Sequence, residues 1–221
     1  METVKRIVVL GFIGLAATWL AGCAKYVTVP VPPRVNLDGF GVIGLVEFET
    51  GHDDSGLGEL ATRQFIETLQ AAQPGVPIVE LGSAEWVLGS VRSRQFDRDT
   101  IRAIGQTHEV DTIITGQLDI KNISSKFAFS SDGLPRVNAR VDKQATLSTR
   151  LIGTADGATL WTDTSSARVT VGGGNLDGNG HGGVRVSGKG EAELALTRTV
   201  VEYSTDDFRG SYVRRRVVED E

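Results

Sequence analysis

Residues 136–161, RVNARVDKQATLSTRLIGTADGATLW, decide the second half of the fold. The apolar side chains that recur here with a single parity are Val137, Ala139, Val141, Ala145, Leu147 and Leu151. A period of two is typical of a strand with one buried face. Asp156-Gly157 is a hairpin turn signal, and a second alternating run follows it. We therefore predict two antiparallel strands, at residues 136–152 and 158–171.

The first half of the chain alternates between short apolar runs and amphipathic segments. The runs typical of buried strands are 41–48, 76–81 and 111–120. The segments with helical spacing are 56–73, 98–110 (with Asp97 or Asp99 near its start) and, at the far end of the chain, 191–203. This order predicts an α/β (α+β) fold. It is β-α-β-α-β followed by antiparallel strands and a C-terminal helix, with one mixed sheet and helices packed on it.

The N-terminus has the features of a secretory signal. Lys5 and Arg6 precede an uncharged apolar run from Ile7 to Leu20, which is shorter than the roughly 20 residues needed to span a bilayer. The run ends in Leu20-Ala21-Gly22-Cys23, and Cys23 is the only cysteine in the chain. We predict a signal peptide at residues 1–22.

The remaining chain divides into three predicted parts. Residues 23–40 contain Pro30, Pro32 and Pro33, which favour an extended tether. Residues 41–209 form the α/β domain. Residues 210–221 form a charged tail that includes Arg214-Arg-Arg216.

Composition excludes some classes of function. The formal net charge is −5, so the chain lacks the basic face that nucleic-acid binding requires. We expect no metal, no cofactor and no nucleic-acid partner.

Five stretches resemble known families. Leu20-Ala-Gly-Cys23 resembles the lipobox of bacterial lipoproteins, which implies cleavage between Gly22 and Cys23 and an acylated N-terminus at Cys23. An acylated Cys23 would leave no thiol for a disulfide or a cysteine metal site. Ala24 at the next position favours the outer membrane. Four other stretches are similar to the CsgG-like group of outer-membrane lipoproteins and to its relatives. The relatives include the lipoprotein activators of peptidoglycan synthases and the N-terminal domain of the Tol-system β-propeller protein. These stretches are Val42–Phe48, Gly58–Leu69, His108–Gly116 and Leu147–Trp161.

Several candidate sites have a simpler structural interpretation. His52-Asp53-Asp54 could serve acid–base chemistry or could be a solvated turn that caps a helix. Residues 172–183 are glycine-rich and resemble calcium-binding repeats, but one irregular copy favours a loop. His52, His108 and His181 have no evident serine partner. Arg214-Arg-Arg216 could bind anionic headgroups or a partner, or could belong to a solvated tail. Asn122-Ile-Ser124 fits a glycosylation sequon, which has little weight in a bacterial lipoprotein.

These observations favour a lipid-anchored lipoprotein on the periplasmic face of the outer membrane. We expect no enzymatic activity and a role in binding a periplasmic or outer-membrane protein, or in assembly with further copies of the chain. One alternative is an oligomeric secretion pore like the curli channel, although Arg140 and Lys143 interrupt the alternation that lipid-facing strands require. A second alternative is a cell-wall enzyme that uses His52 and nearby carboxylates.

Overall fold

The computed structural model describes residues 26–51, 55–129, 137–176 and 189–216. The chain divides into two compact units. The larger unit is Pro33–Arg209, and the smaller unit combines Met1–Pro32 with Gly210–Glu221.

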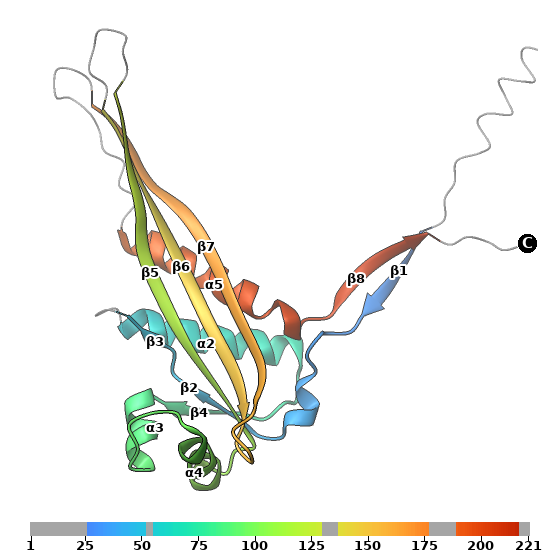
Figure 1. Ribbon diagram of the computed structural model, residues 1–221. Helices are drawn as coiled ribbons and strands as arrows, with labels where there is room; N and C mark the ends of the chain where they lie inside the picture. The colour runs from blue at the N-terminus through green and yellow to red at the C-terminus, as the bar shows by residue number, and fades with distance from the viewer. Residues whose placement is uncertain (1–25, 52–54, 130–136, 177–188, 217–221) are drawn as a thin grey trace, which may run out of the picture. The chain divides into compact units, whose positions relative to one another are not determined.

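The larger unit contains a mixed sheet of six strands (Figure 1). Its strands are β2 (Ile43–Val46), β3 (Glu49–Thr50), β4 (Ile78–Gly82), β5 (Thr112–Phe129), β6 (Val137–Gly153) and β7 (Thr159–Leu176). The spatial order is β4-β2-β5-β6-β7, with β3 paired to β5. β2 runs parallel to β4 and β5, whereas β5, β6 and β7 are antiparallel. The predicted mixed sheet and its hairpin are confirmed.

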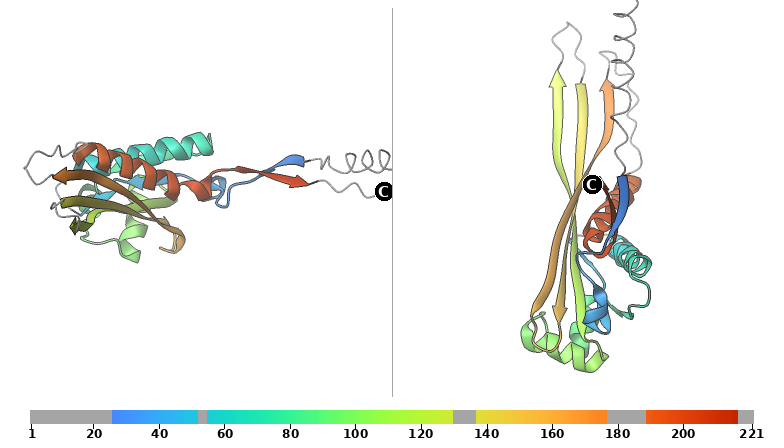
Figure 2. Two further views of the ribbon diagram at one scale, coloured as in Figure 1. Left: turned by 90° about the horizontal axis from the view of Figure 1, so that it is seen from above. Right: turned by 90° about the vertical axis from the view of Figure 1, so that its right-hand side faces the viewer.

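Four α-helices and two short 3₁₀ helices pack on this sheet in the described part of the chain. They are η1 (Leu37–Phe40), α2 (Ser55–Ala72), α3 (Ala84–Ser90), α4 (Arg98–His108), α5 (Lys189–Ser204) and η2 (Asp206–Phe208). Figure 2 shows α2 and α5 along one side of the long strands and α3 and α4 at one end of them. None of the described helices has both the length and the hydropathy needed to cross a membrane.

Neighbouring residues of a strand enter two different cores, because successive side chains point to opposite faces of the sheet. Ile114 and Leu151 pack with α2 and α5, whereas Ile113 and Ile152 pack with α3 and α4. The predicted parity of β6 is found in the core beneath α2 and α5, where the buried residues of this strand are Ala145, Leu147 and Leu151.

The start of α4 is fixed by Asp97. Its Oδ1 accepts a hydrogen bond from the backbone N–H of Thr100 at 2.8 Å, as an N-cap residue does. This hydrogen bond is the main cause that holds the pKa of Asp97 below its ordinary value of 3.8.

The end of the predicted tether over residues 23–40 belongs to the larger unit, which begins at Pro33. Tyr26–Val31 is a strand, β1, and Leu37 is fully buried in the core of the larger unit. The Gln73 amide explains this burial, because it accepts from the N–H of Leu37 at 2.7 Å and donates to the carbonyl of Val35 at 2.8 Å. The larger unit therefore begins at Pro33.

The predictions for the late segments need similar correction. Gly172–Leu176 belongs to β7 and is not a loop, because this stretch pairs with β6. Residues 177–183 and the suggested return strand at 184–186 lie outside the described residues. Ser211–Arg216 is not a loose tail but a strand, β8.

β8 pairs antiparallel with β1 to form a two-stranded sheet in the smaller unit (Figure 1). We call this pair of strands the terminal ribbon, Tyr26–Val31 with Ser211–Arg216. Each of its residues is exposed, apart from the half-buried Val31.

Candidate functional site

Two adjoining hollows form a cleft where β2 ends. Their volumes are about 370 and 230 Å³. The residues that line both hollows are Glu47, Glu49, Ala84 and Gln117. This is the carboxyl end of the parallel strand β2, where the chain crosses to β3 and where α/β sheets commonly bind ligands.

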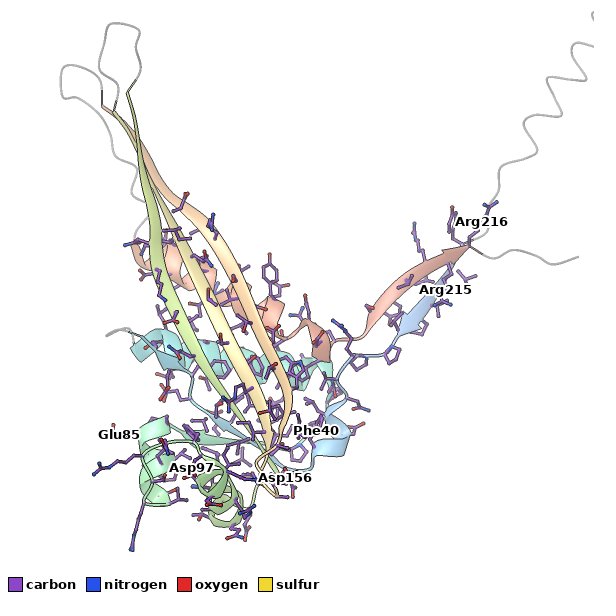
Figure 3. All side chains as sticks on the ribbon, in the orientation of Figure 1. Phe40, Glu85, Asp97, Asp156, Arg215 and Arg216 are labelled. Atoms are coloured by element: carbon purple, nitrogen blue, oxygen red, sulfur yellow. The ribbon has the colours of Figure 1, made fainter. Side chains whose placement is uncertain are left out.

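The two sides of the cleft differ in chemistry. The carboxylates of Glu47, Glu49 and Glu85 lie on the β2–β3 and α3 side. Ser148 and Arg150 of β6 line the opposite side. Figure 3 shows Glu85 on α3, at the outer end of this region. The cleft therefore offers carboxylates together with a guanidinium group and hydroxyl groups.

The backbone around the cleft is rigidly held. Glu47 N–H donates to the carbonyl of Gly82 at 2.9 Å, and the Ser83 hydroxyl accepts from the N–H of Trp86 at 3.3 Å to begin α3. Gly116 allows the close approach of Phe48, since a Cβ there would lie 2.8 Å from the Phe48 ring. The glutamates of the cleft are thus presented by a fixed scaffold.

The turn that could serve acid–base chemistry or cap a helix lies outside the described residues. His52, Asp53 and Asp54 directly follow Gly51, which lines a small hollow of about 80 Å³ together with Asp119 and Lys121. Convergence of these side chains therefore stays a prediction. Among the residues that the structure describes, no group of three or more histidine, cysteine, aspartate or glutamate side chains is placed to hold a metal ion.

His108 does have a serine partner, contrary to the prediction. Its Nε2 lies 2.9 Å from the hydroxyl oxygen of Ser90, which also lies 2.6 Å from the carbonyl oxygen of Val87. A carbonyl can only accept, so the single hydroxyl proton of Ser90 goes to Val87 and Nε2–H donates to Ser90. His108 is then no base for Ser90. With the Trp86 ring 5.5 Å away, this group joins α3 to α4.

A second surface is the polar face of the three long strands. The register places Gln117, Ser148 and Thr164 in one row across β5, β6 and β7, and all three are exposed. Thr162, Ser166 and Arg168 continue the exposed positions along β7. This face is opposite the one covered by α2 and α5, and an antiparallel sheet can leave such a face to solvent.

β7 is also an edge strand. It pairs with β6 from Val137↔Leu176 to Ile152↔Thr159, and within the described residues no strand pairs with its other side. A long edge strand carries unpaired backbone donors and acceptors and so is a template for pairing with another chain.

Lys143, which interrupts the apolar alternation of β6, has a partner on a helix. Its ammonium group contacts Oε1 of Glu193 on α5, and both side chains are largely buried. The apparent polar interruption of β6 is therefore a neutralised contact between the sheet and α5. Sequence reasoning missed it because the partner lies far away in the chain.

The remaining predicted sites fall in three places. Cys23 and Gly22 lie outside the described residues. Asn122-Ile-Ser124 lies on β5, where the register with β6 shifts, and not in a loop. Arg214-Arg-Arg216 lies on β8.

The cleft itself was not predicted. Ser83, a helix-capping residue ahead of Ala84-Glu-Trp-Val87, was the signal that could have placed α3 at its rim.

No protein-family model and no curated protein sequence matches this chain. Solved structures of similar fold include the PelC dodecamer from Paraburkholderia phytofirmans, with 11% identity over 84% of this chain and 98% of that one, at a TM-score of 0.39.

Lipoprotein GNA1162 from Neisseria meningitidis matches at 15% identity over 75% of this chain and 99% of that one, with a TM-score of 0.34. The LpoB C-terminal domain from Salmonella enterica matches at 10% identity over 58% of this chain and 82% of that one, also at 0.34. Likenesses this distant establish no family and no activity, so the CsgG-like resemblance stays a prediction.

Proposed function

We propose that this chain is a lipid-anchored envelope protein that works by binding another polypeptide or further copies of itself, and not by catalysis. The observation that carries the proposal is the unpaired edge of β7, which runs from Thr159 to Leu176. Cys23 anchors the chain to the bilayer, and Ala24 directs it to the periplasmic face of the outer membrane.

The edge of β7 is suited to pairing because the rest of the strand is well supported. α5 packs on β6 and β7, and the partly buried Trp161, Ala167 and Val169 contact the core beneath it. The strand is therefore presented in an extended conformation before any partner arrives. Pre-organisation of this kind reduces the entropy that strand addition would otherwise cost.

A secretion pore is the second candidate, favoured by the length of β5, β6 and β7. The burial of Lys143 against Glu193 also removes one objection to it. However, α5 covers part of β6, and that part cannot face lipid. The only part of β6 that could cross a membrane is then the segment beyond Lys143, Val137–Asp142. This is shorter than the roughly 9–11 residues that a membrane-crossing strand needs. We therefore rank assembly above the pore; liposome conductance by the purified protein would reverse the order.

A cell-wall enzyme ranks third. It requires His52 and Asp53 to act with the carboxylates of the cleft. A His52→Ala/Asp53→Ala double variant that supports normal growth and normal cell-wall composition would count against it.

Photo-crosslinking in intact cells tests the assembly proposal. A photoreactive amino acid replaces Thr164 on the edge strand in one full-length variant and Ser148 on the central strand in a matched control. The two side chains share one face and lie 3.4 Å apart, hydroxyl to hydroxyl, so they differ mainly in distance from the edge. An added strand would lie about 4.8 Å from β7 and about twice as far from β6.

Edge pairing predicts a strong, defined adduct at position 164 and a weak one at position 148. A homodimer mass identifies self-assembly, and a heterodimer mass identifies another protein. Equal adducts at both positions would assign binding to the polar face instead, and no adduct at either would overturn the proposal.

A further inference from the structure

The terminal ribbon brings the two ends of the chain into register. Tyr26 lies opposite Arg216, Val27 opposite Arg215 and Thr28 opposite Arg214. All three arginines therefore gather at the end where β1 begins. Figure 3 shows Arg215 and Arg216 at this end of the ribbon.

This end lies close to the predicted anchor whatever path the intervening chain takes. Cys23 precedes Tyr26 by three peptide units. Because consecutive Cα atoms advance by at most about 3.6 Å, Cys23 lies within about 11 Å of the Tyr26 Cα. Acyl chains on Cys23 would thus enter the bilayer beside three guanidinium groups.

The ribbon also exposes apolar and aromatic side chains. Tyr26 is 62% exposed and Tyr212 is 76% exposed. Residues directly opposite each other share a face, so Val27 and Val29 lie on the face of Val213 and Arg215. Tyr26, Tyr212, Arg214 and Arg216 lie on the other face. Two strands alone are marginally stable in water, and these side chains gain little burial from each other. A binding partner that covers them would stabilise the ribbon.

The bilayer surface fits this combination. Tyrosine rings and valines suit the boundary between headgroups and acyl chains, and arginine stems extend so that their guanidinium groups reach phosphate. Each arginine near an anionic surface raises membrane association roughly fivefold. Glu219, Asp220 and Glu221 follow in the sequence and oppose this attraction.

We propose that the terminal ribbon lies in the headgroup layer of the bilayer, with the face of Val27, Val29 and Val213 toward the acyl chains. The long side chains of Arg215 on this face and of Arg214 and Arg216 on the other then reach the phosphates of anionic lipids. The inference rests on the proposed anchoring of Cys23. It makes the ribbon a second membrane contact, contributed by the C-terminal end of the chain.

Spin labelling of the full-length, processed protein tests this. An acylated Cys23 carries no free thiol, so a Val213→Cys variant takes one label on the ribbon. The protein is reconstituted into vesicles with or without phosphatidylglycerol. Collision of the label with a water-soluble nickel complex is then measured against collision with oxygen. A Gln70→Cys variant, labelled at an exposed position of α2, provides the matched label on the larger unit.

We expect the label at position 213 to lose access to the nickel complex only in vesicles that contain phosphatidylglycerol. Arg214→Gln/Arg215→Gln/Arg216→Gln should abolish this protection, and the corresponding triple lysine variant should retain it. Arg63→Gln/Arg92→Gln/Arg94→Gln, which removes three exposed arginines elsewhere, should have no effect. Glu219→Gln/Asp220→Asn/Glu221→Gln should increase the protection. High salt should weaken it, since the screening length falls to about 3 Å at 1 M.

The outcomes separate this inference from the proposed function. Failure of the protein to sediment with vesicles would refute the anchor. Sedimentation with an accessible label at position 213 would overturn the ribbon inference alone. Spin–spin broadening would assign the ribbon to a second copy, and protection in cells but not in vesicles would assign it to a protein partner; either result contradicts lipid binding.

Discussion

Lys143 of β6 and Glu193 of α5 form an ion pair between the sheet and the helix that covers it. Their side chains are only 6% and 14% exposed. Taking two charges out of water is costly, and each is tolerated because the other is present. The pair fixes α5 at one position along β6.

Removing one partner of this ion pair should therefore lower the free energy of unfolding more than removing both. We expect Glu193→Ala to lower the free energy of unfolding by about 3–5 kcal/mol, because it leaves the Lys143 charge buried. Lys143→Met/Glu193→Leu should restore most of this loss. Urea denaturation followed by circular dichroism measures both.

The exposed pair Lys121–Asp119 provides the control. Its atoms lie 3.9 Å apart and the Lys121 side chain is 75% exposed. Lys121→Met should change the free energy of unfolding by at most about 1 kcal/mol. A loss as large as that of Glu193→Ala would mean that burial does not explain the effect.

Among the polar residues near the end of α2, Gln73 should be the one whose substitution lowers the free energy of unfolding most. It bonds the backbone of Val35 and Leu37 and also donates to the carbonyl of Phe208 at 2.9 Å. Gln73→Leu keeps the volume but leaves these backbone groups unpaired, which should cost about 3 kcal/mol in urea denaturation. Gln70→Ala, at an exposed position of the same helix, should change stability by less than about 0.5 kcal/mol. Equal losses of stability in the Gln73→Leu and Gln70→Ala variants would contradict a special role for the hydrogen bonds of Gln73.

The helix cap at Asp97 should make stability depend on pH. Folding lowers the pKa of Asp97 below 3.8, mainly through the hydrogen bond from Thr100 N–H. The stabilisation is therefore present above that value and is lost as the pH falls through the pKa of the folded state. Asp97→Ala should lower the melting temperature at neutral pH, and the difference from the unaltered protein should shrink in acid.

Asp99→Ala is the matched control for the cap. Asp99 lies in the first turn of the same helix and its exposed side chain pairs with Arg102 at 3.1 Å. We expect a smaller change in melting temperature than for Asp97→Ala. A pH-independent effect of Asp97→Ala would show that the cap does not act through the charged carboxylate.

Anchoring is tested by two substitutions at the predicted processing site. Cys23→Ser should leave the chain unprocessed or release it from membranes, since no acyl chain can attach. Ala24→Asp should keep it acylated but retain it in the inner membrane. Separation of the two membranes on a density gradient, followed by immunoblotting, distinguishes these results. A processed, membrane-bound Cys23→Ser variant would refute the proposed anchor.

The parts of the fold that were predicted depend on neighbouring residues. The alternation around Leu147 and the Asp156-Gly157 turn located the β6–β7 hairpin, because strand periodicity and turn chemistry are local. The end of β5 was missed, since Lys121-Asn-Ile-Ser-Ser-Lys126 has no apolar alternation and is held by its pairing with β6.

The sequence by itself predicted most of the helices and strands of the larger unit, and it carries the motif of the proposed anchor at Cys23. Only the tertiary structure decided that Lys143 is paired, that Leu37 belongs to the core and that Arg216 lies opposite Tyr26. The physical reason is distance along the chain. Periodicity and capping act over a few residues, whereas each of these three features joins residues that only folding brings together.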